Sequence, residues 1–302
     1  MIRASRLAKI YFHTSHSTES VMKNIQTIFA TVLTAASLSV SAATEPPDAP
    51  SGGTPAMNVV LVHGAFADGS GWRPVYDELT RRGYRVTIVQ NPLTSLADDV
   101  ASTTRALDRQ EGPTILVGHS WGGTIITEAG THANVVGLVY VSALAPDAGE
   151  STAQQYQGFA ATPDFVIDTH KDGFGFLSPG KFKAGFAHDV SDEDAAFLRD
   201  SQVPINMSVF ETKVTQAAWR TKPSWAVIAT EDKAFDQAML VHMATRIGAD
   251  ITKVSGSHAV FMTQPKVVAS TIDRAAREVA QKFTSQSESD RQTALLVPSN
   301  DL

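Results

Sequence analysis

One short stretch constrains the fold more than any other, because an apolar run ends there in a glycine-rich turn that leads directly into a helix-like segment. Residues 115–117 are apolar, the pentapeptide Gly-His-Ser-Trp-Gly centred on Ser120 follows, and the chain from Thr124 onward is typical of a helix. In a strand, turn and helix of this kind, Gly-x-Ser-x-Gly holds a serine hydroxyl clear of a sheet. The glycines suit a cramped turn, where a Cβ atom would collide with backbone. Ser120 is therefore a candidate nucleophile, although the pentapeptide alone also fits an ordinary turn.

Apolar runs alternate with helix-like segments on both sides of this turn. Strands are expected at residues 58–62, 84–89, 114–117, 135–141, 224–229 and 250–254, with helices between them and a last helix from Pro265 to about Phe283. The strands are apolar without strict alternation, which is typical of a mostly parallel sheet covered on both faces. The pattern predicts an α/β fold with a doubly wound sheet, formed by residues 58–145 and 223–283. A polar tail follows at 284–302.

Residues 146–222 interrupt the alternation of predicted strands and helices. They hold eight of the 14 phenylalanines, and a segment of this length between two core strands is unlike a bare loop. We expect a largely helical lid inserted over the carboxyl edge of the sheet, where open α/β folds bind ligands. Most of these aromatic residues should form the core of the lid itself. Phe159, Phe174 and Phe176 are candidates for the substrate pocket, together with Phe66.

The partners of a serine nucleophile follow two later strands. A serine hydroxyl needs a histidine base, and the histidine needs a carboxylate that orients it. Asp232 comes after the strand at 224–229, and His258 comes after the strand at 250–254, so both should lie at the same sheet edge as Ser120. Glu231 is the alternative acid, and we favour Asp232 because successive residues leaving a strand point in opposite directions. The predicted triad is Ser120, His258 and Asp232.

Acyl transfer also requires two backbone donors for the developing oxyanion. The residue after the nucleophile usually supplies one, and the loop after the first strand supplies the other. These positions are Trp121 and Ala65, with Phe66 as the alternative in the loop. His63 lies in that loop, and we interpret it as a structural histidine that braces the loop.

Taken together, these motifs resemble the α/β-hydrolase superfamily over residues 58–283, apart from the lid. They are most similar to the esterase branch that includes plant methylesterases and hydroxynitrile lyases, and to bacterial carboxylesterases built in the same way. The resemblance implies hydrolysis of small-molecule carboxylic esters through an acyl-serine intermediate, without a metal or an organic cofactor. Hydroxynitrile lyases of this branch carry lysine and threonine where this chain has Ala259 and Gly64, so cyanohydrin cleavage is disfavoured.

A carboxylesterase-type serine hydrolase is therefore the leading hypothesis. The same triad also serves lactone, amide or C–C bond hydrolysis, and a cofactor-free haloperoxidase activity occurs on similar scaffolds. The alternative from another class is a non-catalytic ligand-binding protein of hydrolase fold.

The net charge and the absence of cysteine exclude several classes of partner and of chemistry. The formal net charge is −6 and the body of the chain has no long basic run, which argues against nucleic acid as a partner. Cysteine is absent, so disulfides, thiolate metal sites and a cysteine nucleophile are excluded.

The N-terminal region predicts export. Residues 1–43 read as an extended N-terminus and a signal peptide, in which an apolar segment at about 25–38 is followed by small residues and a cleavage point near Ala42 or Ala43. Met22 is an alternative start. Residues 44–57 read as a linker, and we expect a periplasmic or secreted protein without a stable membrane anchor.

Overall fold

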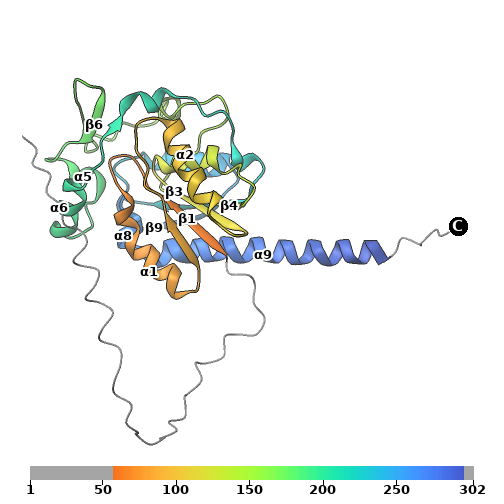
Figure 1. The fold of residues 1–302 in the computed structure, drawn as a ribbon. Helices are drawn as coiled ribbons and strands as arrows, with labels where there is room; N and C mark the ends of the chain where they lie inside the picture. The colour runs from red at the N-terminus through yellow and green to blue at the C-terminus, as the bar shows by residue number, and fades with distance from the viewer. Residues whose placement is uncertain (1–56, 296–302) are drawn as a thin grey trace, which may run out of the picture. The chain divides into compact units, whose positions relative to one another are not determined.

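Six parallel strands form the main sheet, in the order β2-β1-β3-β4-β8-β9 (Figure 1). The computed structural model describes residues 57–295, so the predicted signal peptide lies outside the described residues. The parallel order confirms the α/β fold and the mostly parallel sheet that the sequence predicted. The strands are β1 (Asn58–Val62), β2 (Arg85–Ile88), β3 (Thr114–His119), β4 (Val135–Val141), β8 (Ser224–Ala229) and β9 (Asp250–Val254).

Helices cover both faces of this sheet. On one face, α1 and α9 pack against each other and α9 crosses β4 and β8, whereas α2 and α3 lie together on the other face (Figure 1). The side chain of Ser95 caps α2 by accepting the backbone N–H of Asp98. The helices are α1 (Arg73–Arg81), α2 (Leu96–Asp108), α3 (Gly122–Ala129), α7 (Gln237–Arg246), α8 (Val260–Thr263) and α9 (Pro265–Leu295), with the short 3₁₀ helix η1 (Gly69–Trp72) before α1.

The position of each strand explains its composition. Every residue of the inner strands β1, β3 and β8 is buried, because helices cover both of their faces. The edge strands β2 and β9 are only partly buried, and they contain charged residues such as Arg85 and Lys253. The apolar runs of the sequence therefore mark the middle of the sheet.

The last helix is longer than the sequence indicated. The expectation that it ends near Phe283 is wrong, because α9 continues to Leu295. Val279 is the last buried position among those residues of α9 whose side chains the structure describes, and it lies in the part that the sequence predicted as helix. Among the described residues, none of the helices combines the length and the hydropathy that a transmembrane span requires.

Residues 146–222, which we call the insertion, connect β4 to β8 and contain a small antiparallel sheet of β5, β6 and β7. The expected largely helical lid did not include this sheet. A tight turn at Gly173, with φ of 85°, joins β5 to β6 and allows the hairpin to form. The elements are α4 (Thr152–Gln155), β5 (Ile167–Thr169), β6 (Phe174–Leu177), α5 (Phe182–Phe186), α6 (Asp192–Asp200), β7 (Ile205–Asn206), η2 (Met207–Glu211) and η3 (Ala218–Arg220).

Candidate active site

Ser120 occupies a strained turn between β3 and α3. Its φ is 53°, a left-handed value that a non-glycine residue adopts at a cost. The neighbouring glycines permit the turn. A Cβ at Gly118 would lie 2.5 Å from the carbonyl oxygen of Gly122, and one at Gly122 would lie 2.6 Å from the carbonyl oxygen of Val62. The turn therefore needs glycine at both positions, as the sequence pattern predicted.

The loops after β8 and β9 bring a carboxylate and an imidazole together. Oδ2 of Asp232 lies 2.8 Å from Nδ1 of His258, and neither side chain is exposed to solvent. The other carboxylate oxygen, Oδ1, accepts the backbone N–H groups of Ala234 at 2.8 Å and Phe235 at 3.0 Å. Both oxygens of Asp232 are thus occupied, which keeps the carboxylate in one orientation and stabilises its negative charge.

The second imidazole nitrogen of His258 is available. Nε2 is buried and has no hydrogen-bond partner among the described residues, Ser120 included. The rings of Phe165 and Phe235 lie 6.2 Å and 5.0 Å from the His258 ring, between centroids, and both phenylalanines line the cavity that contains Ser120. Hydrogen bonds between a nucleophile and its base are often long in ligand-free structures and tighten when substrate binds. The free nitrogen is the one that a general base would use.

Glu231, the alternative acid, lies elsewhere. Its Oε1 accepts the hydroxyl of Ser255 at 2.6 Å on the exposed surface, and its backbone carbonyl accepts an N–H from His188 at 3.0 Å. The structure therefore brings Asp232, and not Glu231, to His258.

Two further histidines support the site without entering the cavity. Nε2 of His119 donates to the carbonyl oxygen of His258 at 2.9 Å, and the two rings lie 4.5 Å apart. Burial, together with the nearby His258, holds the pKa of His119 well below its usual value, so His119 stays neutral. His63 accepts the backbone N–H of Asn91 at Nε2 and donates from Nδ1 to the carbonyl oxygen of Gly64, in agreement with a bracing role for its loop.

The two predicted oxyanion donors lie at the cavity that holds Ser120. Ala65 and Trp121 both line it, and neither backbone N–H pairs with an acceptor among the described residues in a turn or cap. Phe66, the alternative donor, has a φ of 60° and contributes its ring to the same cavity. The residues that carry the two predicted donors and the hydroxyl therefore line one cavity.

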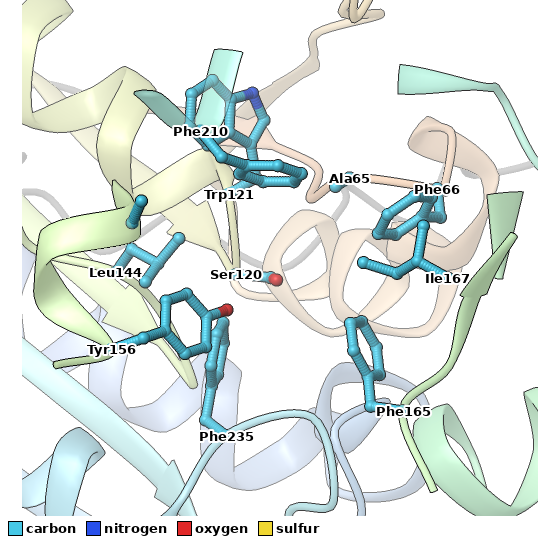
Figure 2. A pocket seen from close by; sticks show the side chains of 11 residues that line it. Ala65, Phe66, Ser120, Trp121, Leu144, Tyr156, Phe165, Ile167, Phe210 and Phe235 are labelled. Atoms are coloured by element: carbon cyan, nitrogen blue, oxygen red, sulfur yellow. The ribbon is translucent and has the colours of Figure 1, made fainter. Parts of the chain in front are cut away.

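This cavity encloses about 310 Å³ and is predominantly apolar (Figure 2). Among the described residues, no charged side chain lines it. Its lining comes from the hydrolase-like core and from the insertion, and consists of Ala65, Phe66, Ser120, Trp121, Leu144, Ala153, Tyr156, Phe165, Ile167, Phe210 and Phe235.

Of the aromatic residues predicted for the pocket, only Phe66 lines it. Phe174 and Phe176 lie on β6, where burial alternates and where Gly175 and Leu177 are the buried residues, so the two phenylalanines occupy the opposite face. Phe159 packs instead against His242 at 5.6 Å between ring centroids. The prediction of Phe159, Phe174 and Phe176 as pocket residues is therefore wrong, because the alternation of β6 turns two of them away and Phe159, which lies before the hairpin, packs on α7.

The sequence reasoning missed several lining residues. Phe235 carried a signal, because it lies three positions after Asp232 and must share its turn. Tyr156, Phe165 and Phe210 belong to the insertion, and no sequence pattern separated them from its other aromatic residues. Within residues 57–295, no group of three or more histidine, aspartate or glutamate side chains is arranged to hold a metal ion.

Comparisons with known proteins agree with the fold. Residues 59–271 match the model of the alpha/beta hydrolase family. The alpha/beta hydrolase nvfD of Aspergillus novofumigatus is 26% identical over 243 residues, which are 73% of this chain and 96% of that protein.

Solved structures with low sequence identity share the same fold. A pyrethroid hydrolase from Sphingobium faniae JZ-2 is similar with a TM-score of 0.64 and 20% identity, covering 74% of this chain and 97% of that chain. Polyneuridine aldehyde esterase gives a TM-score of 0.65 at 17% identity, covering 73% and 99%. An extracellular alpha/beta-hydrolase from a Paenibacillus species gives 0.62 at 21% identity, covering 72% and 98%.

Proposed function

The chain belongs to the alpha/beta hydrolase family, and from this premise we propose that it is a serine hydrolase that cleaves carboxylic esters through an acyl-serine intermediate. One observation carries the proposal. The buried pair of Asp232 and His258 leaves one imidazole nitrogen free beside a cavity that contains Ser120 and two backbone donors. These are the components that acyl transfer requires.

Each residue has a distinct role in this mechanism. Ser120 Oγ attacks the ester carbonyl while Nε2 of His258 takes its proton, and Asp232 stabilises the imidazolium that forms. The Ala65 and Trp121 amides hold the oxyanion, and each donor of this kind contributes on the order of 10²- to 10³-fold in rate. His258 then returns the proton to the leaving alcohol. A water molecule, activated by the same histidine, releases the acid and restores Ser120.

Two features support a neutral, largely apolar ester as the substrate. The cavity volume of about 310 Å³ suits a small ligand, and the lining offers no positive side chain that would pair with a charged substrate. Two structural neighbours are named a pyrethroid hydrolase and an esterase, which is compatible with this class. Lactones, amides and activated C–C bonds are further substrates that the same residues are able to attack.

Turnover of p-nitrophenyl esters, combined with labelling by a fluorophosphonate, tests the proposal. The wild-type protein should hydrolyse short esters and become labelled at one serine. Ser120→Ala should abolish both signals, while Ser102→Ala, a change on α2 away from the cavity, should preserve them. Binding of an apolar ligand without turnover of any ester would replace the proposal with a ligand-binding role.

Export of the protein is also part of the proposal. The pattern in residues 1–43 predicts cleavage near Ala42 or Ala43 and release into the periplasm or the medium. N-terminal sequencing of protein from the native host tests this directly, and an intact N-terminus would contradict it.

A further inference from the structure

Three side chains that line the cavity carry a polar atom, and one of them has no assigned role. Ser120 is the proposed nucleophile. The indole N–H of Trp121 donates to Oδ2 of Asp99 at 2.9 Å, so it is occupied. The hydroxyl of Tyr156 has no hydrogen-bond partner among the described residues, and Figure 2 shows it at the cavity end of the ring, on the side of Ser120. It is a free donor in an otherwise apolar space.

The backbone around Tyr156 is held firmly to the core. Tyr156 directly follows α4, and the side chain of Gln155 accepts the backbone N–H of Ala145 at 3.2 Å. At the other end of α4, the Thr152 hydroxyl lies 3.2 Å from that of Thr124, in the helix that begins after the nucleophile. The backbone that carries Tyr156 is therefore held to the segment after β4 and to α3, the helix that follows Ser120.

The environment also keeps Tyr156 protonated. Its ring packs against Phe235 at 5.8 Å between centroids. Tyr156 is 39% exposed, and the partial loss of solvent around its ring, with a further contribution from the negative charge of Asp232, raises the pKa of Tyr156 above its usual value. At neutral pH the group is thus a neutral phenol that donates a hydrogen bond, and it carries no charge that would repel an ester oxygen.

We propose that the Tyr156 hydroxyl binds a second oxygen of the substrate, so that the site selects neutral esters that carry an ether or carbonyl oxygen close to the scissile ester. This inference rests on the proposed esterase function and specifies its substrate class. A bound all-hydrocarbon ester would cover the partly exposed hydroxyl without pairing it, and removing a polar group from water without a partner is costly. An ester with an acceptor oxygen removes that penalty.

Pairs of esters of matched shape test the inference. On the acyl side, p-nitrophenyl methoxyacetate and p-nitrophenyl butyrate differ by one oxygen in place of a methylene group. On the alcohol side, 2-methoxyethyl butyrate and butyl butyrate differ in the same way. For each pair the ratio of kcat/KM values is compared between the wild type and Tyr156→Phe, so that the intrinsic reactivity of the esters cancels.

The preference for the oxygenated ester should fall about tenfold in Tyr156→Phe for at least one pair, which corresponds to the net value of one hydrogen bond. Tyr84→Phe is the matched control, since its hydroxyl donates to Asp273 at 2.7 Å in a partly buried contact and Tyr84 does not line the cavity, so both ratios should stay as in the wild type. If Tyr156→Phe changed kcat/KM by the same factor for both esters of each pair, the inference would be overturned. Tyr156 would then act without regard to a second oxygen.

A binding measurement separates this inference from the proposed function. 4-Phenylbutan-2-one and butylbenzene have similar shapes, and only the ketone carries an acceptor oxygen. Their affinities are followed by tryptophan fluorescence, since Trp121 lines the cavity. The wild type should bind the ketone more tightly, and Tyr156→Phe should lose this difference whether or not any ester is hydrolysed. Equal binding of the two ligands by the wild type would overturn the role of Tyr156 even if esters are turned over.

Discussion

Nδ1 of His258 lies 2.8 Å from Oδ2 of Asp232, and both side chains are closed off from solvent. Because the backbone N–H groups of Ala234 and Phe235 occupy the other carboxylate oxygen, the carboxylate has no freedom to rotate away. A histidine that takes a proton in this position gains a paired counter-charge in a low-dielectric environment. The pairing therefore favours Asp232 as the residue that orients the base.

Replacing this carboxylate should damage catalysis far more than replacing its neighbour. Asp232→Asn should lower kcat by about 10⁴, because an amide fails to hold the required histidine tautomer. Glu231→Gln should change kcat less than about twofold, because Glu231 contacts Ser255 at the surface. Steady-state hydrolysis of a p-nitrophenyl ester measures both. If kcat fell strongly in Glu231→Gln and little in Asp232→Asn, Glu231 would be the residue that orients His258.

The turn around Ser120 should tolerate no added methyl group. In Gly118→Ala the new Cβ would meet the backbone of Gly122 at 2.5 Å, so we expect the free energy of unfolding to fall by about 3 kcal/mol or more. Gly180→Ala is the matched control, since nothing lies within 4 Å of its added Cβ, and its stability should stay within about 0.5 kcal/mol of the wild type. Urea denaturation measures both variants. Equal stability of the two would show that the turn relaxes.

The sequence predicted that Asp232 and His258 lie close together because their positions depend on local patterns. Ser120, Asp232 and His258 each follow a strand of the main sheet, and parallel strands place their carboxyl ends at one edge of the sheet. The side-chain contact between Asp232 and His258 therefore followed from the order of the strands together with the chemistry of the three residues.

The lining of the cavity depends on contacts that no local pattern contains. Phe165 faces His258 and Phe159 packs on His242, although both are aromatic residues of the same insertion. Their directions depend on contacts with His258 and His242, which lie far from them in the sequence. The hydrogen bond between the side chains of Trp121 and Asp99 was also not predictable from the sequence. Asp99 is one of two adjacent aspartates in the first turn of α2, and no local pattern distinguishes it from Asp98.

Asp99 should give the protein an unusual dependence of stability on pH. Burial raises its pKa to about 6, although the hydrogen bonds from Trp121 and Leu93 act in the opposite direction. Since this value lies above the unfolded one of about 3.9, the folded protein binds more protons between about pH 4 and pH 6. The contribution of Asp99 to the free energy of unfolding should therefore fall by about 3 kcal/mol as the pH rises through this window.

Comparison with Asp99→Asn isolates this effect. The stability difference between the wild type and Asp99→Asn should shrink as the pH rises from 4 to 7, as measured by urea denaturation at each pH. Asp98→Asn is the matched control, for which the pH dependence of stability should run in the opposite direction. Hydrogen bonds from Ser95 and Thr94 lower the pKa of Asp98, whereas the pKa of Asp99 is raised. The stabilising contribution of Asp98 is lost as the pH falls. A wild type whose advantage over Asp99→Asn grows between pH 4 and 7 would contradict the raised pKa.

The insertion also holds the loop that carries His258, and Asp189 is the main contact. Its Oδ2 accepts the backbone N–H of Ser257 at 2.9 Å and the hydroxyl of Thr263 at 3.0 Å. Burial alone would raise the pKa of Asp189, but these hydrogen bonds outweigh burial and lower it. On the other side of His258, the backbone N–H of Ala259 donates to the carbonyl oxygen of Phe186. The base is thus held from both sides by one segment of the insertion.

Removing this contact should affect the chemical step more than substrate binding. In Asp189→Ala we expect kcat to fall about tenfold, because small displacements of a base cost orders of magnitude in rate, while KM changes less than about twofold, since Asp189 does not line the cavity. Asp168→Ala, an exposed position on β5, is the matched control and should keep both constants. If Asp189→Ala instead raised KM at constant kcat, the insertion would control access of the substrate and would have no part in positioning the base.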